Sequence, residues 1–329
     1  MTGPDDREAH DEEASVDAPL ERALRRQPLS PAALARVRVA VEAELRESAR
    51  RAALRRQWYR VAGLAACLAI LAVTAAIVLR PAESAVLVGS IAQGQEDGLQ
   101  VHSGLFATRV AGPGAQLHVG ERWETNGSTV IDLAGGGQMR LARDTVIEAS
   151  EGNHFSLRAG RAYLDFPARA AHFVLHTARG YIEHLGTQFE VISSGDDVRI
   201  RVREGSVQLH TPEGTEVTRA GQELFVPESG ARERRRISTY GGDWGWVEAI
   251  APRYDIEDRS VAEFLIWVAR ETGRHVDFVD DRSRDVAVQT RLHGSIRKLG
   301  PLEALTRVLE TTSLRAELHD DTIRVTSGT

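Results

Sequence analysis

Only one cysteine, Cys67, and one lysine, Lys298, occur among the 329 residues. A single cysteine excludes an intramolecular disulfide, a Cys-x-x-Cys redox pair and a cysteine-based zinc knuckle. Positive charge is not in excess either, because 47 acidic and 41 basic residues give a net charge of −6. That balance argues against a compact nucleic-acid-binding protein, so we expect no direct nucleic-acid contact. The length predicts two or three domains, and 42% apolar residues suffice for at least one large core.

Sequence patterns typical of catalysis are missing as well. The triplet Gly135 to Gly137 is not followed by Lys-Ser/Thr, and no Gly-x-Ser-x-Gly motif occurs. The run HFVLH places His172 and His176 four residues apart, with His184 beyond, but its strand pattern separates the two by roughly 13 Å. Paired aspartates fall where turns are expected, at Asp196-Asp197, Asp280-Asp281 and Asp320-Asp321. We therefore predict no catalytic residue, no metal site and no cofactor, and we expect that the protein is not an enzyme.

One long uncharged run stands out, from Val61 to Leu79. As a helix its nineteen residues would extend for roughly 29 Å, which matches the hydrocarbon core of a bilayer. Six arginines precede the run, at Arg46, Arg50, Arg51, Arg55, Arg56 and Arg60, and only Arg80 closely follows it. This asymmetry predicts a single-pass membrane protein with a cytoplasmic N-terminus and an exported C-terminal part.

The residues before this run fall into two segments of different composition. Residues 1–29 are acidic and poor in large apolar residues, which predicts a disordered cytoplasmic tail. Ser30-Pro31 is typical of a helix start, and residues 30–60 read as an amphipathic juxtamembrane helix. Its apolar stripe consists of Leu34, Val37, Val41 and Leu45. The stripe either binds a cytoplasmic partner or extends the anchor along the membrane surface.

Residues 85–230 change to short alternating runs separated by glycine and aspartate turns, which predicts an all-β periplasmic domain. In VRIRVREGSVQL the apolar Val198, Ile200 and Val202 alternate with Arg199, Arg201 and Arg203. That alternation predicts a strand with one buried and one solvated face. A sandwich, a barrel and a β-helix-like stack all fit this pattern.

Residues 231–253 are polar and broken by glycines, which predicts a linker. Its arginine run, Arg232, Arg234, Arg235 and Arg236, is typical of a solvated charge cluster, although an acidic partner is the alternative. Trp244 and Trp246 either anchor the linker onto a neighbouring domain or present a periplasmic contact surface to a partner.

Residues 254–327 contain a short internal repeat, in which Ser260 to Asp281 align without gaps with Gly300 to Asp321. Each copy has an amphipathic helix, an alternating strand and then two aspartates. Two such halves predict a small α+β domain of the βαβ-βαβ type. The fold class is thus a membrane-anchored multidomain protein with one transmembrane helix, an all-β domain and this α+β domain.

The β region resembles the FecR family of membrane signal transducers. Leu185 to Val191, LGTQFEV, is similar to the family's Gly-Thr-x-Phe-x-Val, and SLRAGRAYLDF resembles its Leu-x-x-Gly element. VREGSVQL and TRAGQELFV resemble the family's later hairpins, and ERWETNGSTVIDLAGGGQMRL its early hairpin. The C-terminal region is similar to the short N-terminal domain of secretins and TonB-dependent receptors.

These resemblances imply a single-pass protein of the bacterial inner membrane, with its N-terminus in the cytoplasm and its C-terminus in the periplasm. They also imply a regulator of the anti-sigma or sigma-regulator type that relays a periplasmic protein-binding signal to the cytoplasm. The implied partners are an extracytoplasmic-function sigma factor inside and an outer-membrane receptor or other envelope protein outside. Family members usually carry tryptophans in the cytoplasmic domain, whereas residues 1–57 contain none. A second hypothesis is therefore an envelope adaptor whose exported domains bind a secretion pore, a receptor or a cell-wall component.

Overall fold

The computed structural model describes residues 86–328 apart from 105, 106, 152, 168 and 185, and in addition the helical residues 31, 32, 35, 36, 38–41, 66, 67, 69 and 71. Contacts divide the chain into two compact units, Met1–Glu83 and Ser84–Thr329. Among the described residues no helix has the length and apolar character needed to cross a membrane, and the predicted span at 61–79 lies mostly outside those residues.

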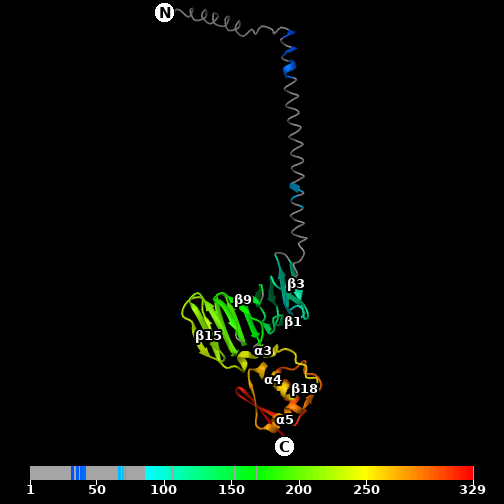
Figure 1. Ribbon diagram of the computed structural model, residues 1–329, viewed down its shortest axis with the longest axis vertical. Helices are drawn as coiled ribbons and strands as arrows, with labels where there is room; N and C mark the ends of the chain where they lie inside the picture. The colour runs from blue at the N-terminus through cyan, green and yellow to red at the C-terminus, as the bar shows by residue number, and fades with distance from the viewer. Residues whose placement is uncertain are drawn as a thin grey trace, which may run out of the picture. The chain divides into compact units, whose positions relative to one another are not determined.

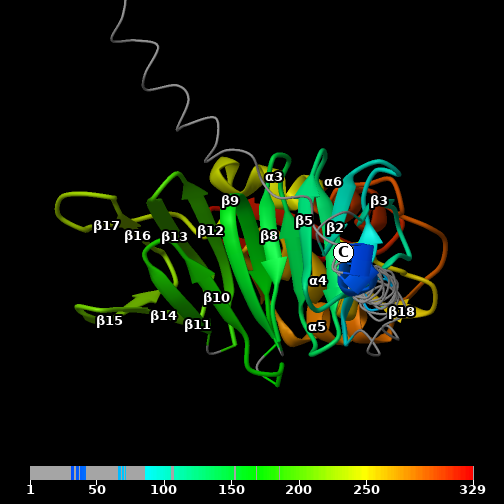
Figure 2. The ribbon, with the colours of Figure 1, turned by 90° about the horizontal axis from the view of Figure 1, so that it is seen from above.

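The second unit is dominated by β-structure, as the sequence predicted. Its described residues contain a continuous 17-stranded sheet that folds into two layers (Figures 1 and 2). In hydrogen-bonding order, layer one consists of β4 (Gln116–His118), β1 (Leu87–Gln93), β6 (Thr129–Leu133), β7 (Gln138–Leu141), β9 (His154–Asp165), β12 (Gln188–Ser194), β13 (Asp197–Glu204), β16 (Gln222–Val226) and β17 (Glu233–Arg236). Layer two consists of β3 (Ala107–Ala111), β2 (Leu99–Ser103), β5 (Glu121–Thr125), β8 (Val146–Ala149), β9, β10 (Val174–Thr177), β11 (Gly180–His184), β14 (Ser206–Thr211) and β15 (Gly214–Arg219).

Strand β9 belongs to both layers and turns at Gly160. Its first half pairs with β8 and β10 in layer two, and its second half pairs with β7 and β12 in layer one. Gly160 has φ +93°, and a Cβ atom there would lie 2.5 Å from the Cα of Thr145. Only glycine adopts this φ readily and has no Cβ atom to collide with Thr145. This is the physical reason for the glycine in SLRAGRAYLDF.

Apolar side chains from both layers fill the space between them. Trp123 is fully buried and packs against Phe155 at a ring distance of 5.8 Å, and Phe155 stacks on Phe173 at 5.1 Å. Val198, Ile200 and Val202 of β13 join the same core, as their alternation predicted. Of the three architectures left open by the sequence, the two-layered arrangement is a sandwich, in which the chain crosses repeatedly from one layer to the other.

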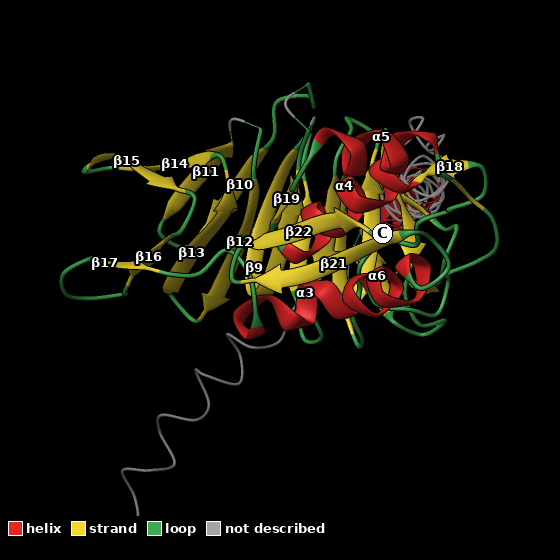
Figure 3. Cartoon of the chain, turned by 90° about the horizontal axis from the view of Figure 1, so that it is seen from below, coloured by secondary structure: helices red, strands yellow, loops and turns green. Residues whose placement is uncertain are grey.

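The C-terminal part mixes helices with short strands (Figure 3). After the 3-10 turn η2 (Gly242–Trp244) and helix α3 (Gly245–Ala249), it contains β18 (Arg259–Ser260), α4 (Val261–Thr272), β19 (His275–Phe278), α5 (Asp281–Gln289), β20 (Arg291–Leu292), α6 (Pro301–Leu309), β21 (Leu314–His319) and β22 (Thr322–Ser327). Strand β22 lies between β19, to which it is parallel, and β21, to which it is antiparallel. Helix α4 contacts α5, α6 and β19.

The internal repeat corresponds to α4 with β19 and to α6 with β21. Helix α4 begins with a capping box, in which Ser260 and Glu263 satisfy each other's backbone N–H groups, and it ends at Gly273 in the left-handed conformation. The aspartate pairs differ between the copies. Asp280 caps the N-terminus of α5, whereas Asp320 and Asp321 form the hairpin turn between β21 and β22.

Candidate functional site

A row of charged and polar side chains crosses the outer face of layer one. Each member lies directly opposite the next on the neighbouring strand. The charged row consists of Arg140 on β7, Tyr163 on β9, Glu190 on β12, Arg201 on β13, Glu223 on β16 and Arg235 on β17. Opposite charges on adjacent strands attract each other, so the row holds the register of layer one on its outer side.

The ion pairs within the row are short and mostly buried. Arg201 contacts the carboxylates of Glu190 at 3.1 Å and Glu223 at 3.3 Å. Glu223 is buried, which by itself raises its pKa, but hydrogen bonds from Arg235 and Arg199 outweigh burial and lower the pKa of that carboxyl. The carboxylate therefore stays ionised inside the row.

Trp244 covers the middle of the charged row. Its ring is fully buried and meets Tyr163 edge to face at 6.1 Å, while the guanidinium groups of Arg201 and Arg203 each lie 5.1 Å from its ring centre. The indole Nε1 donates a hydrogen bond to the carbonyl oxygen of Ser238 at 2.8 Å. Trp244 has no exposed surface. Its arrangement is therefore that of a side chain that anchors the linker, rather than one that presents a contact surface to a partner.

Trp246 lies at the edge of the same contact and is half-buried. Its Nε1 donates to Glu190 Oε1 at 2.6 Å, and the guanidinium of Arg161 lies 5.7 Å from its ring centre. The ring is thus fixed on layer one and partly accessible. Binding of a periplasmic partner by Trp246 stays a prediction.

Arg203 and the row member Arg140 connect layer one to helix α4. Arg203 donates to the carbonyl oxygens of Thr239 at 2.8 Å and Glu271 at 3.0 Å, and to the carboxylate of Glu248 at 3.1 Å. Arg140 donates to the carbonyl oxygen of Val247 at 3.0 Å and pairs with the Glu271 carboxylate at 2.7 Å. These contacts join the β layers, the segment 237–249 and α4. We call the charged row with Trp244, Arg203 and Glu271 the junction.

Burial governs the electrostatics of the junction. The side chains of Arg140 and Glu271 are 1% and 4% exposed. Burial raises the pKa of Glu271, against the opposing effect of Arg140, and burial also raises the pKa of Glu248. A buried ion pair adds little net stability but makes one arrangement of the parts specific. The structure shows the junction in one arrangement, with Arg140 and Glu271 paired inside it.

Two expectations on arginines need correction. The outer face of β13 is not wholly solvated, because α3, α4 and η2 cover Arg201 and Arg203, which are 6% and 3% exposed. The arginine run lies partly in strand β17 rather than in a linker, and Arg234 to Arg236 pair there with β16 while they remain exposed, as expected of a solvated cluster. Arg235 bonds Glu223 there, so part of the run supports the sheet.

The predicted cytoplasmic stripe is only partly within the described residues. Val41 is helical and 51% exposed, whereas Leu34, Val37 and Leu45 lie outside those residues. The role of the stripe stays a prediction.

Replacing Gly273 by alanine is expected to lower the free energy of unfolding by about 2–4 kcal/mol. Gly273 has φ +65°, and an added Cβ would lie 2.0 Å from the Thr239 carbonyl oxygen and 2.2 Å from Arg203 Nε. Gly195→Ala is the matched control, because its φ is +59° but no atom lies within 4 Å of the added Cβ. Urea unfolding should show a loss of only about 1–2 kcal/mol for the control. Equal losses in the two variants would contradict a tight contact at Gly273.

Sequence reasoning missed Arg140, Glu190 and Glu271 as members of a site. One signal was present, since Glu190 stands between the apolar Phe189 and Val191 in the strand LGTQFEV. A carboxylate at the centre of a strong strand needs a partner if it is covered. The partner, Arg201, lies eleven residues away along the chain and across a hairpin.

Comparison with known protein families gives a match, and it lies within the β layers. Residues 121–208 match the family model described as "FecR protein", which confirms the family resemblance for this segment. No curated protein gives a significant match. Two crystal structures of a Parabacteroides distasonis ATCC 8503 protein, provisionally assigned as an anti-sigma factor, are 13% and 14% identical to this chain, with TM-scores of 0.33 and 0.34. Each alignment covers 63% of this chain and 97% of that chain.

Proposed function

Because residues 121–208 belong to the FecR family, we propose that this chain is a sigma-factor regulator that carries a signal by protein contact. The FecR match is the observation that carries the proposal. The matched segment includes Arg140, Glu190, Arg201 and Arg203 and therefore forms one wall of the junction. The FecR family is regulatory, and this role requires no catalytic group.

The proposed topology is that of a single-pass inner-membrane protein with its N-terminus in the cytoplasm. It is supported by the uncharged run from Val61 to Leu79 and by the arginines that precede it. In this topology the β layers and the C-terminal part face the periplasm. An outer-membrane receptor or another envelope protein would bind them there.

Relay of the signal needs two arrangements of the exported part that the outer partner binds unequally, since equal binding shifts no equilibrium. The junction supports this proposal because it joins three segments of the chain through buried charges. Its opening would expose several charged groups at once. A partner that binds one side of the junction would therefore change an all-or-none contact.

The test uses the apolar stripe of the cytoplasmic helix. The full chain is immobilised, incubated with lysate of the source organism, and the retained sigma subunits are identified by mass spectrometry. We expect one sigma factor to be retained and to be lost in the double variant Val37→Asp/Val41→Asp, because two carboxylates cannot be desolvated in an apolar contact.

Val39→Asp is the matched control. Val39 is helical and 69% exposed, but it points away from the stripe by helical periodicity. It should leave retention of the sigma factor unchanged. If no sigma factor binds the wild type while the exported part still captures an envelope protein, the adaptor hypothesis replaces the regulator.

A further inference from the structure

The outer face of layer two carries ring side chains in cross-strand register. His176 on β10 lies opposite Tyr181 on β11, and Tyr181 lies opposite His210 on β14. Tyr181 stacks on His210 at a ring distance of 4.6 Å, and His176 lies 5.9 Å from Tyr181. These rings are outside the junction, which occupies the other layer.

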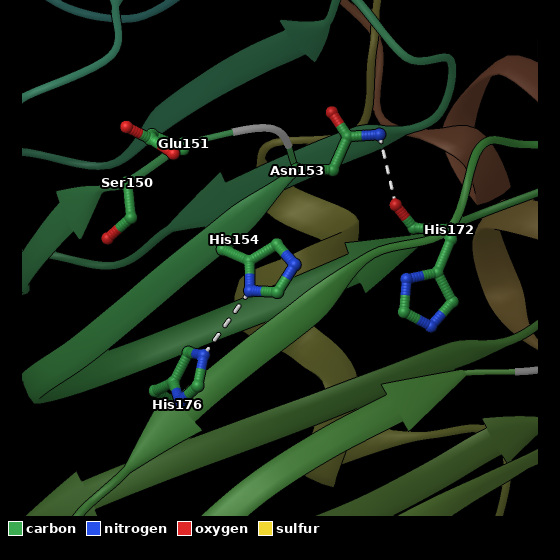
Figure 4. Close-up of a pocket in the computed structure, with 6 residues that line it drawn as sticks. All are labelled: Ser150, Glu151, Asn153, His154, His172 and His176. Atoms are coloured by element: carbon green, nitrogen blue, oxygen red, sulfur yellow. Dashed lines mark hydrogen bonds between the residues drawn. The ribbon is translucent and has the colours of Figure 1, made fainter.

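His154 extends this row onto β9. It is the first residue of β9, and the parallel pairing with β10 sets it diagonally from His176. The two imidazole rings are stacked at 5.7 Å with an interplanar angle of 28°, and His154 Nδ1 lies 3.5 Å from His176 Nε2 (Figure 4). Two ring nitrogens from different strands thus face each other.

The neighbouring histidines are satisfied in a different way. The Glu183 carboxylate contacts His172 Nε2 at 3.1 Å and His210 Nε2 at 2.9 Å, so both rings have a carboxylate partner. Within the described part of the chain, neither His154 nor His176 forms an ion pair with a carboxylate. The two rings share one hydrogen bond, between His176 Nε2 and His154 Nδ1, and ring nitrogens of histidine are also common metal ligands.

We propose that His154 Nδ1 and His176 Nε2 bind a divalent transition-metal ion of the Zn²⁺ and Cu²⁺ class. Two nitrogens at the usual zinc distance and a tetrahedral angle lie roughly 3.3–3.4 Å apart. The observed 3.5 Å is close to this separation. Imidazole nitrogen is a preferred ligand of these ions, whereas Mg²⁺ and Ca²⁺ prefer oxygen.

The surroundings leave room for the remaining ligands. The two histidines line a hollow of about 740 Å³ together with Ser150, Glu151, Asn153 and His172 (Figure 4). No group of three or more histidine, cysteine or acidic side chains with metal-site geometry occurs among the described residues. Water would therefore complete the coordination, and the site would be open and exchangeable rather than structural. Sequence reasoning weighed His176 with His172 and His184 and did not consider His154.

The experiment titrates the untagged full chain, stripped of metal with EDTA, with Zn²⁺ by calorimetry at neutral pH. We expect one Zn²⁺ per chain. His154→Gln and His176→Gln should each weaken binding by about tenfold or more. His319→Gln is the control, because His319 is an exposed histidine that contacts Glu317 at 3.2 Å outside the β layers, and it should leave the affinity unchanged.

Electron paramagnetic resonance of the Cu²⁺-loaded wild type gives a second readout that needs no variant. Coupling to two imidazole nitrogens is expected. The proposal is overturned if the wild type binds no Zn²⁺, if the double variant His154→Gln/His176→Gln keeps the wild-type affinity, or if the copper spectrum shows coupling to one nitrogen only. Both residues lie on the surface, so circular dichroism should show that the variants remain folded.

Discussion

Replacing Glu271 by alanine is expected to lower the free energy of unfolding by about 3–5 kcal/mol, because Arg140 would keep its charge in a buried site without its carboxyl partner. Arg140 and Glu271 are almost fully covered, and their contact of 2.7 Å joins β7 to α4. Urea unfolding followed by tryptophan fluorescence measures the loss. The exposed pair Arg307 and Glu310 supplies the control, since Glu310→Ala should cost less than about 1 kcal/mol.

The double variant Arg140→Met/Glu271→Leu distinguishes the loss of a partner from the loss of packing. Removing both charges leaves no uncompensated ion, so most of the stability should return. If the double variant is as unstable as Glu271→Ala, the ion pair is not the cause.

The dependence of stability on pH gives an independent check of the same carboxyl. Burial raises the pKa of Glu271, so above the ordinary range of a glutamate the folded state binds more protons than the unfolded state. The stabilising contribution of the protonated carboxyl is complete below the unfolded pKa and is lost as pH rises through the folded pKa. Glu271→Gln should remove this decrease. A decrease of the same size in that variant would assign it to other groups.

Replacing Trp244 by alanine is expected to cost about 3–5 kcal/mol and to separate the segment 237–249 from layer one. The side chain is fully buried, packs on Tyr163 and lies beside the guanidinium groups of Arg201 and Arg203. Its removal opens a cavity beside these charged groups. Urea unfolding gives the loss of stability, and limited proteolysis should show faster cleavage within 237–249.

Trp244→Phe is the matched control for this site. Phenylalanine keeps most of the apolar contact but loses the hydrogen bond from Nε1 to the Ser238 carbonyl oxygen, which should cost only about 1–3 kcal/mol. Unchanged proteolysis of Trp244→Ala would show that the indole does not hold the segment on layer one.

Much of the fold could be predicted from local pattern. Alternation in β13 correctly predicted the buried Val198, Ile200 and Val202, because the period of a strand places every second side chain on one face. Ser260 and Gly273 bound α4 as a capping residue and a left-handed terminus should. The family motif around Leu185 to Val191 falls within the segment that matches the FecR model.

The candidate site was much less accessible from sequence. The alternation of its strand predicts that Arg203 is solvated. No feature of the neighbouring sequence indicates that α3 and α4 cover it. Trp244 could be interpreted equally as an anchor or as a contact surface, and its burial depends on Tyr163, which lies about eighty residues earlier.

By itself the sequence determined the alternation of strands, the helix termini and the FecR motifs, because each depends on residues within a few positions of one another. Tertiary structure decided which faces meet. Glu271 pairs with Arg140, from which it is separated by more than a hundred residues along the chain. His176 lies beside His154 rather than beside His172, although His172 and His176 belong to the same run HFVLH. The first pair follows from the packing of α4 on layer one, and the second follows from the pairing of β9 with β10. Neither leaves a trace in local spacing, because both join residues that are distant along the chain.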